Sequence, residues 1–281
     1  MKLRCGDRLL PLDRTVIMGV LNVTPDSFSD GGLWVEAGAA TRHAVAMVEQ
    51  GAGILDVGGE STRPGAQPVA EDEELERVLP VIEALSGIVE VPISIDTRKA
   101  SVARRAVAAG ASIVNDTGGE RSDRALDEVA SDSGAAIVVM HSRGTPATMR
   151  SLTEYDDVVD DVAGWLGTRA GELEAGGLPS DAIVLDPGFG FAKTPEQNLE
   201  LLRRLDEVVG LGFPVVAGTS RKSFIGDILG LPVHERIEGT AATVSWAVAR
   251  GAHIVRVHDV EPIARVVKMI DAIRGAQAVA S

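Results

Sequence analysis

The feature that most constrains the fold is a series of eight short apolar runs along the chain. Each is rich in Ile, Val or Leu without polar alternation, and together they cover Val16–Leu21, Ile54–Val57, Ile93–Ile95, Ile113–Val114, Ile137–Met140, Ile183–Leu185, Val215–Ala217 and Ile254–Val257. Such runs are typical of parallel strands buried on both faces. Segments of helical periodicity lie between them, for example 75–85, 155–166 and 224–229. Eight strands that alternate with helices predict an α/β fold, a (β/α)8 TIM barrel.

An open, doubly wound sheet is the alternative architecture. It usually has fewer strands, and its glycine fingerprint is missing, because Met18-Gly19-Val20-Leu21-Asn22 is not G-x-G-x-x-G and there is no P-loop. We therefore expect a single domain over residues 1–281. Residues 1–15 should form a small hairpin turning at Gly6-Asp7, residues 16–275 the barrel and residues 276–281 a tail.

Charge and cysteine content narrow the classes of function. The chain carries 27 Lys plus Arg against 41 Asp plus Glu, a net charge of -14, which argues against nucleic acid and membrane partners. The one cysteine, Cys5, excludes an internal disulfide and a thiolate zinc site made by this chain alone. The first eight residues carry charge where a secretory signal would be apolar, and no run approaches the roughly 18 apolar residues of a membrane span. We expect a cytoplasmic protein.

Polar residues follow the apolar runs, at the strand ends where barrel enzymes place their catalytic groups. They are Asn22, Glu60-Ser61-Thr62-Arg63, Asp96, Asn115-Asp116, His141, Asp186, Thr219-Ser220-Arg221-Lys222, and Arg256 with His258. One such residue could simply cap a helix, but all eight ends carry one. A subset of four offers carboxylates, an amide and one cation, which suits a flat heterocycle with several N–H donors and a carbonyl: Asp96, Asn115, Asp186 and Lys222.

A second subset concentrates positive charge in an acidic protein, which indicates an anion site for phosphate or diphosphate. It consists of Arg63, Arg221, Arg256 and His258. The alternative is that these arginines pair with acidic neighbours on the surface. The histidine spacing does not fit a zinc hydrolase. Mg²⁺ fits better, because it takes few protein oxygens and keeps its waters and the phosphates, and Asn22 could supply one ligand.

Two loops after the first two strands, Asn22–Gly32 and Gly58–Pro68, are long and rich in Gly, Pro, Ser and Asp. Loops of this kind commonly bind or cover ligands, although they could be passive connections. Phe28 has no helix or strand face to bury against, and we expect it to cover a ligand. A third loop, Asp186–Lys193, places two further phenylalanines near the sixth strand.

Several of these segments resemble the signatures of the dihydropteroate synthase family. The matching segments run in order along nearly the whole chain: Met18–Gly32, Asp56–Gly65, Ser94–Thr97, Asn115-Asp116, Met140-His141, Arg143–Pro146, Asp186–Phe191, Gly218–Ser223 and Arg256–Asp259. Departures are few: Thr117-Gly118 stands where V-S is more usual, and Ser142 where methionine is common. They bear on pocket shape only.

The resemblance implies a (β/α)8 barrel that condenses 6-hydroxymethyl-7,8-dihydropterin diphosphate with p-aminobenzoate, releasing diphosphate and 7,8-dihydropteroate. It implies that Asp96, Asn115, Asp186 and Lys222 bind the pterin, that Asn22 binds Mg²⁺, and that Asn22, Thr62, Arg63, Arg256 and His258 bind the diphosphate. The p-aminobenzoate pocket would be Phe28, Thr62, Pro64, Phe191, Lys222 and Ser223. Asp30, Arg63, Lys222 and Arg256 would be catalytic. Sulfonamide sensitivity and a homodimer are also implied by the resemblance alone.

Two alternatives to this function stay open at the level of sequence. A related pterin-binding barrel that transfers a methyl group from methyltetrahydrofolate to a corrinoid protein would share the pterin residues. It has no use for the two diphosphate loops, and this chain has both. The second alternative is a non-catalytic pterin-binding protein that keeps the fold and has lost the reaction. Release of diphosphate from both substrates with Mg²⁺ would distinguish these possibilities.

Overall fold

The computed structural model describes residues 1–24, 32–61 and 65–275, with residues 32–36 described by their backbone only. Eight parallel strands form one sheet in the order β8-β7-β6-β5-β4-β3-β10-β9. A parallel bridge between Leu185 and Val215 brings the two edges of this sheet together. The TIM barrel expected from the sequence is confirmed. Its strands are β3 Val16–Asn22, β4 Ile54–Gly58, β5 Ile93–Asp96, β6 Ile113–Asp116, β7 Ala136–Met140, β8 Ile183–Asp186, β9 Val216–Ala217 and β10 Ile254–Val257.

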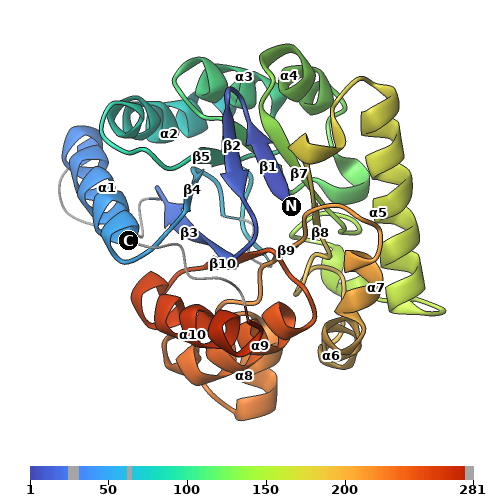
Figure 1. Cartoon of the computed structure of the whole chain (residues 1–281). Helices are drawn as coiled ribbons and strands as arrows, with labels where there is room; N and C mark the ends of the chain where they lie inside the picture. The colour runs from blue at the N-terminus through green and yellow to red at the C-terminus, as the bar shows by residue number, and fades with distance from the viewer. Residues whose placement is uncertain (25–31, 62–64, 276–281) are drawn as a thin grey trace.

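Helices form a layer around the strands (Figure 1). Their apolar faces pack on the outer surface of the sheet in one continuous core that includes Leu55, Ile82, Leu166 and Val255. Within the 224–229 segment only part of the expected apolar face is buried, because Ile228 and Leu229 are exposed. The helices are α1 Gly32–Glu49, α2 Glu71–Ser86, α3 Ala100–Ala108, α4 Ala125–Ser133, α5 Val158–Ala175, α6 Pro195–Arg203, α7 Leu205–Val209, α8 Ser223–Leu229, α9 Ile237–Ala249 and α10 Val260–Ile273.

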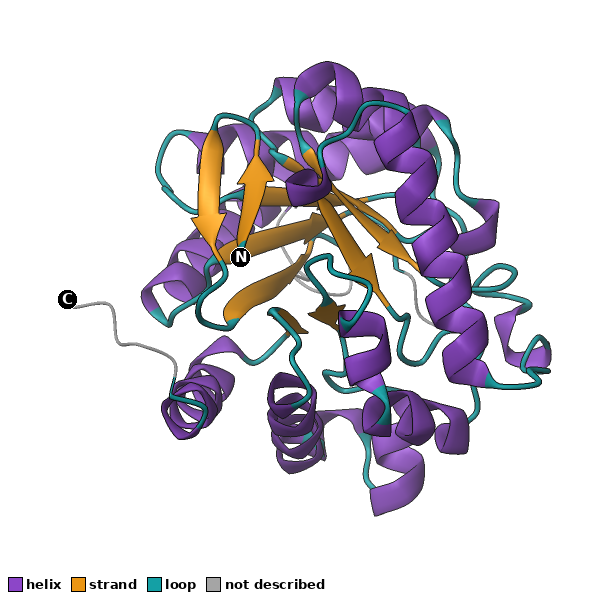
Figure 2. Ribbon diagram, turned by 45° about the vertical axis from the view of Figure 1, so that its right-hand side comes forward, coloured by secondary structure: helices purple, strands orange, loops and turns teal. Residues whose placement is uncertain are grey.

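The N-terminal segment forms the expected hairpin, with β1 Lys2–Cys5 paired antiparallel to β2 Arg8–Pro11. Gly6 turns it with a φ of 62°, in the left-handed region that glycine adopts without steric cost. The hairpin lies across one end of the barrel (Figures 1 and 2). Leu3 and Cys5 of the hairpin pack against the inward apolar residues at the amino ends of the strands and close that end of the barrel.

The interior of the barrel changes character along its axis. Side chains two residues apart on a strand point to the same face, so each inward apolar residue predicts the direction of a second residue closer to the carboxyl end. On four strands, the residue nearer the amino end belongs to the inner apolar cluster, and the residue two positions further on is polar. These pairs are Ile54 and Asp56, Ile113 and Asn115, Val184 and Asp186, and Ile254 and Arg256. The fold thus places polar groups together at the end opposite the hairpin.

Candidate active site

A network of charged side chains crosses the upper interior of the barrel. Arg256 donates from Nε to Oδ2 of Asp56 at 2.6 Å and from Nη2 to Oδ2 of Asp96 at 2.7 Å. Both carboxylates are buried. Burial alone would lower the pKa of Arg256, but Asp56 and Asp96 outweigh it and hold this pKa above its ordinary value. The guanidinium therefore stays charged within the barrel.

Asn115 presents an unused acceptor to the same space. Its Nδ2 donates to Oδ2 and Oδ1 of Asp56, at 3.1 and 3.3 Å, which leaves its Oδ1 pointing elsewhere. This Oδ1 is buried and has no hydrogen-bond partner in the described part of the chain. A buried polar atom without a partner costs about 1–3 kcal/mol. A ligand N–H group placed here would remove that cost.

The pKa of the Asp96 carboxyl is raised above its ordinary value. Burial raises the pKa of Asp96 to about 7; Arg256 opposes the shift, Asp56 adds to it, and Thr117 lowers it by a hydrogen bond. The Thr117 hydroxyl donates to Oδ1 of Asp96 at 3.2 Å. The carboxylate can therefore exchange a proton near neutral pH.

Asp186 and Lys222 both line one cavity inside the barrel. The backbone N–H of Gly188 donates to Oδ1 of Asp186 at 2.7 Å, and burial raises the pKa of this carboxyl. Lys222 lies with its Nζ 3.9 Å from the centre of the Phe191 ring, at the distance of a cation–π contact. Burial and the charge of Arg256 lower the pKa of Lys222 to about 8, although the carboxylates of Asp186 and Asp96 act to raise it. One cavity is lined by Asn115, Thr117, Met140, Asp186, Phe189, Phe191, Gly218, Lys222 and Arg256.

The structure separates the four cations that the sequence groups as an anion site. Arg221 forms an ion pair with Asp259, Nε to Oδ2 at 2.9 Å, so the alternative of acidic neighbours is right for Arg221. Arg256 is paired too, but with carboxylates in the interior. His258 directly follows β10, and its Nδ1 lies 3.1 Å from Oγ of Ser220. Arg63 lies outside the described residues.

The other residues named from the sequence fall into two groups. Asn22 ends β3 and is partly exposed, and Ser223 begins α8 and is exposed. Phe191 is buried and lines the cavity. The remaining residues lie outside the described part of the chain, in the two long loops: Phe28, Asp30, Thr62, Arg63 and Pro64.

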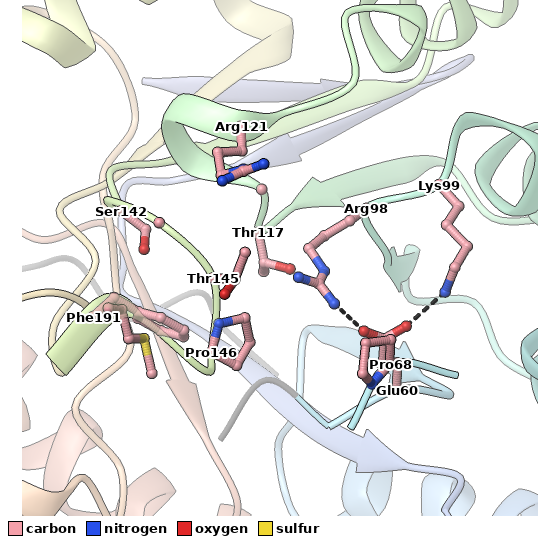
Figure 3. A pocket seen from close by; sticks show the side chains of 13 residues that line it. Glu60, Pro68, Arg98, Lys99, Thr117, Arg121, Ser142, Thr145, Pro146 and Phe191 are labelled. Atoms are coloured by element: carbon pink, nitrogen blue, oxygen red, sulfur yellow. Dashed lines mark hydrogen bonds and ion pairs between the residues drawn. The ribbon is translucent and has the colours of Figure 1, made fainter. Parts of the chain in front are cut away.

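A second cavity of about 210 Å³ adjoins the first. Figure 3 shows Arg98 and Lys99 directed at Glu60 from two sides, with Phe191 at the opposite wall. Lys99 lies 2.6 Å from Glu60, and Arg98 also donates to this carboxylate. Burial alone would raise the pKa of Glu60, but Lys99 and Arg98 hold it below its ordinary value. Glu60 is thus a fixed anion at the base of the second long loop.

Sequence reasoning passed over Asp56, which proves central. It lies inside an apolar run, between Leu55 and Val57, whereas the site residues expected from the sequence follow the runs. Strand alternation was the available signal, because an Asp two residues after Ile54 must share the inward face of Ile54. Thr117, a departure from the usual motif, donates a hydrogen bond to Asp96 and is a further site residue.

The described residues contain neither a cluster that could hold a metal ion nor a helix that could span a membrane. No group of three or more His, Cys, Asp or Glu side chains in that part of the chain is arranged to hold a metal ion. None of the described helices is long and apolar enough to cross a membrane.

Comparison with known proteins gives the class. Residues 18–258 match the family described as pterin binding enzyme, which covers most of the chain. The chain belongs to this family. A dihydropteroate synthase of Synechocystis sp. is 50% identical over 261 residues, which are 92% of this chain and 90% of that protein.

Solved structures agree. A dihydropteroate synthase of Yersinia pestis in complex with a sulfonamide drug has a TM-score of 0.91 and 40% identity, covering 98% of this chain and 100% of that one. The enzyme of Xanthomonas albilineans in complex with 7,8-dihydropteroate has a TM-score of 0.88 and 40% identity, with full coverage of both chains. Within its family, the chain belongs to the dihydropteroate synthases, which are transferases.

Proposed function

We propose that this chain condenses 6-hydroxymethyl-7,8-dihydropterin diphosphate with p-aminobenzoate to give 7,8-dihydropteroate and diphosphate. The observation that carries the proposal is the polar layer inside the barrel, in which the buried Oδ1 of Asn115 has no partner among the described residues. A pterin ring has N–H donors and acceptors along one edge, which match such a layer. The solved relatives that bind a sulfonamide drug and 7,8-dihydropteroate support the same substrates here.

The pterin would bind to Asp96, Asn115, Asp186 and Lys222. The two carboxylates would accept from ring N–H groups, Asn115 would accept through its Oδ1, and Lys222 would donate to a ring acceptor. All four reach the same part of the barrel from four different strands or their ends. Strand register sets the positions of Asp96, Asn115 and Asp186, so this part of the site is fixed before the substrate arrives.

The diphosphate would bind to Arg256 and His258, together with Asn22, Thr62 and Arg63. Nε and Nη2 of Arg256 donate to carboxylates. Among the described residues its Nη1 has no hydrogen-bond partner, so it would serve the leaving group. Asp56 and Asp96 would hold the guanidinium in place for that task.

The reaction needs no covalent nucleophile. The C–O bond between the pterin methylene carbon and the diphosphate breaks, its electron pair leaves with the diphosphate, and the electron-rich dihydropterin stabilises the cation. The amine of p-aminobenzoate then forms the new C–N bond, and the released diphosphate takes up the proton that the amine loses. Arg63 and Arg256 would stabilise the departing charge, and Asp30 would position the reacting carbon. Phe191, Lys222 and Ser223, with Phe28, Thr62 and Pro64, would hold the p-aminobenzoate.

Mg²⁺ fits the residues present. Asn22 supplies a hard amide oxygen at the carboxyl end of β3, and Mg²⁺ commonly takes few protein ligands alongside substrate phosphates. Bound there, the ion would neutralise charge on the diphosphate.

Diphosphate release tests the proposal. The protein is incubated with both substrates and Mg²⁺, and then with each of the three left out in turn. We expect diphosphate only in the complete mixture, and competition between p-aminobenzoate and a sulfonamide. Release that does not depend on p-aminobenzoate would contradict the proposed reaction. No release at all would contradict it too and would favour a non-catalytic pterin-binding protein.

Pterin binding should depend on pH through Asp96. Its pKa of about 7 leaves the carboxylate increasingly protonated as the pH falls, and the protonated form cannot accept two ring N–H bonds. Affinity for 6-hydroxymethylpterin should therefore fall about eightfold from pH 7.5 to pH 6. Calorimetry across this range measures the effect. In Asp96→Asn the slope should disappear, and an unchanged slope would assign the titration to another group.

We further propose a cytoplasmic homodimer. Apolar residues on and just after α8 support an interface between two copies: Ile228, Leu229 and Val233 are 53%, 47% and 45% exposed. Exposed apolar groups gathered on one face commonly mark a contact with another protein. The free, buried Cys5 fits a reducing compartment.

The double substitution Ile228→Glu/Leu229→Glu should convert the dimer into a monomer, because two charges would have to be buried at the interface. Sedimentation velocity measures the mass. Ile88→Glu is the control, since Ile88 is 59% exposed just after α2, which lies across the barrel from α8 (Figure 1), and this substitution should leave the mass unchanged. A double variant that sediments as wild type would place the interface elsewhere.

A further inference from the structure

We infer that Lys193 is a positioning residue for the p-aminobenzoate site, which fixes Phe191 through the backbone of its loop and is itself held by His141. The inference rests on the proposed function, because it concerns how one wall of that site is kept in place. It starts from a charged side chain that neither the pterin nor the diphosphate assignment uses. Lys193 ends the loop that follows β8 and is only 8% exposed.

The Lys193 amine lies within hydrogen-bond distance of four acceptors, of which three are equally near and the fourth, the carbonyl oxygen of His141, is at 3.4 Å. Its Nζ lies 3.1 Å from the carbonyl oxygen of Gly188, 3.1 Å from that of Phe191 and 3.1 Å from Nδ1 of His141. An ammonium group has three N–H donors and no acceptor, so this arrangement uses all of them. When Lys193 is protonated, Nδ1 of His141 can only accept in this contact, so the proton of the neutral ring lies on Nε2.

No carboxylate of the described residues lies within ion-pair distance of this amine. Burying an ammonium without a counter-ion is costly, and burial lowers the pKa of Lys193 to about 7. An apolar side chain would fill the same space without that cost. The three hydrogen bonds are what the lysine provides instead.

The loop needs this support because its backbone is unusual. Gly188, Gly190 and Ala192 have φ values of 72°, 79° and 47°, so three of five consecutive residues are in the left-handed region. Alanine is rarely found there, and such conformations persist only when surrounding contacts hold them. A Cβ at Gly188 would overlap the carbonyl oxygen of His141, which shows how closely the loop packs on the end of β7.

Two further hydrogen bonds hold the backbone of this loop from its outer side. The N–H of Gly190 donates to Oδ1 of Asn198 at 2.7 Å, and the hydroxyl of Tyr155 donates to the carbonyl oxygen of Ala192 at 2.9 Å. Lys193 supplies the inner contacts. Asp186 belongs to β8, so the sheet holds it independently of the loop. Phe191 has no such anchor, and its ring lines both cavities and contacts Lys222.

The Lys193→Met variant tests the inference, because methionine has similar length and no donors. We expect the KM for p-aminobenzoate to rise about tenfold or more, while kcat and the pterin Kd change less than about threefold. Ile82→Ala is the control: Ile82 is buried in α2, which packs on α1, α3, β4 and β5, so its loss should lower Tm without changing KM.

His141 provides a second, independent series. Asparagine places an oxygen near the position of Nδ1, so His141→Asn should keep the KM far closer to wild type than His141→Leu does. In the wild type at pH 6, below the pKa of Lys193, ¹⁵N spectra should show Nδ1 of His141 unprotonated, whether or not any variant folds. A protonated Nδ1, or a Lys193→Met variant with lowered Tm and unchanged KM, would overturn the inference. If the wild type itself gave no turnover, the proposed function would fail first and the inference with it.

Discussion

Arg256→Met should nearly abolish turnover and weaken pterin binding at the same time. Losing a preorganised donor to the leaving group costs about 10²–10³ in kcat. The substitution also leaves Asp56 and Asp96 buried without their counter-ion, and breaking such a group lowers the free energy of unfolding by about 3–5 kcal/mol. Steady-state kinetics, pterin calorimetry and chemical denaturation measure the three effects.

Arg169→Met is the control for the stability loss. Arg169 is a buried arginine of α5 that pairs with Asp127 of α4, outside both cavities. Its removal should lower the free energy of unfolding and leave kcat and pterin affinity within about threefold. If both variants lost turnover equally, the effect of Arg256 would reflect destabilisation and its catalytic assignment would be wrong.

Asp186→Asn should weaken pterin binding about 10- to 100-fold. The N–H of Gly188 needs an acceptor, so the amide oxygen of the new Asn should stay on Gly188. Its NH₂ group would then face the cavity, where the ligand requires an acceptor. Calorimetry with 6-hydroxymethylpterin measures the loss directly, without the diphosphate.

Asp116→Asn makes the same change in a matched setting. Asp116 is buried at the end of β6, and its Oδ1 accepts from the N–H of Gly118 at 2.9 Å, two residues on, as Asp186 does with Gly188. It does not line the pterin cavity. We expect its pterin affinity to stay near wild type. Similar losses in both variants would mean that the turn, and not the carboxylate, determines binding.

The fold could be predicted because its signals are local. Each of the eight apolar runs became a strand, and the N-terminal residues formed the expected hairpin. A strand buried on both faces must be apolar, so its position is readable from composition. The prediction of a buried apolar face on α8 was partly wrong, because Ile228 and Leu229 are exposed. Helical periodicity identifies an apolar stripe but does not indicate which element covers it.

The site was predicted less completely, for a physical reason. Residue types at strand ends identified Asp96, Asn115, Asp186 and Lys222, which the structure brings around one barrel interior. The partners of these residues depend on contacts across the barrel. Asp56 and Arg256 are 200 residues apart in the chain. A reading of Arg256 as a purely diphosphate-binding residue therefore missed its pairing with two carboxylates.

Product identification tests the central claim most directly. The protein is mixed with 6-hydroxymethyl-7,8-dihydropterin diphosphate, Mg²⁺ and isotopically labelled p-aminobenzoate, and the products are analysed by mass spectrometry with diphosphate measured in parallel. We predict labelled 7,8-dihydropteroate and diphosphate in equal amounts, both strongly reduced in Arg256→Met. Diphosphate without labelled dihydropteroate, or neither product from the folded wild-type protein, would contradict the account.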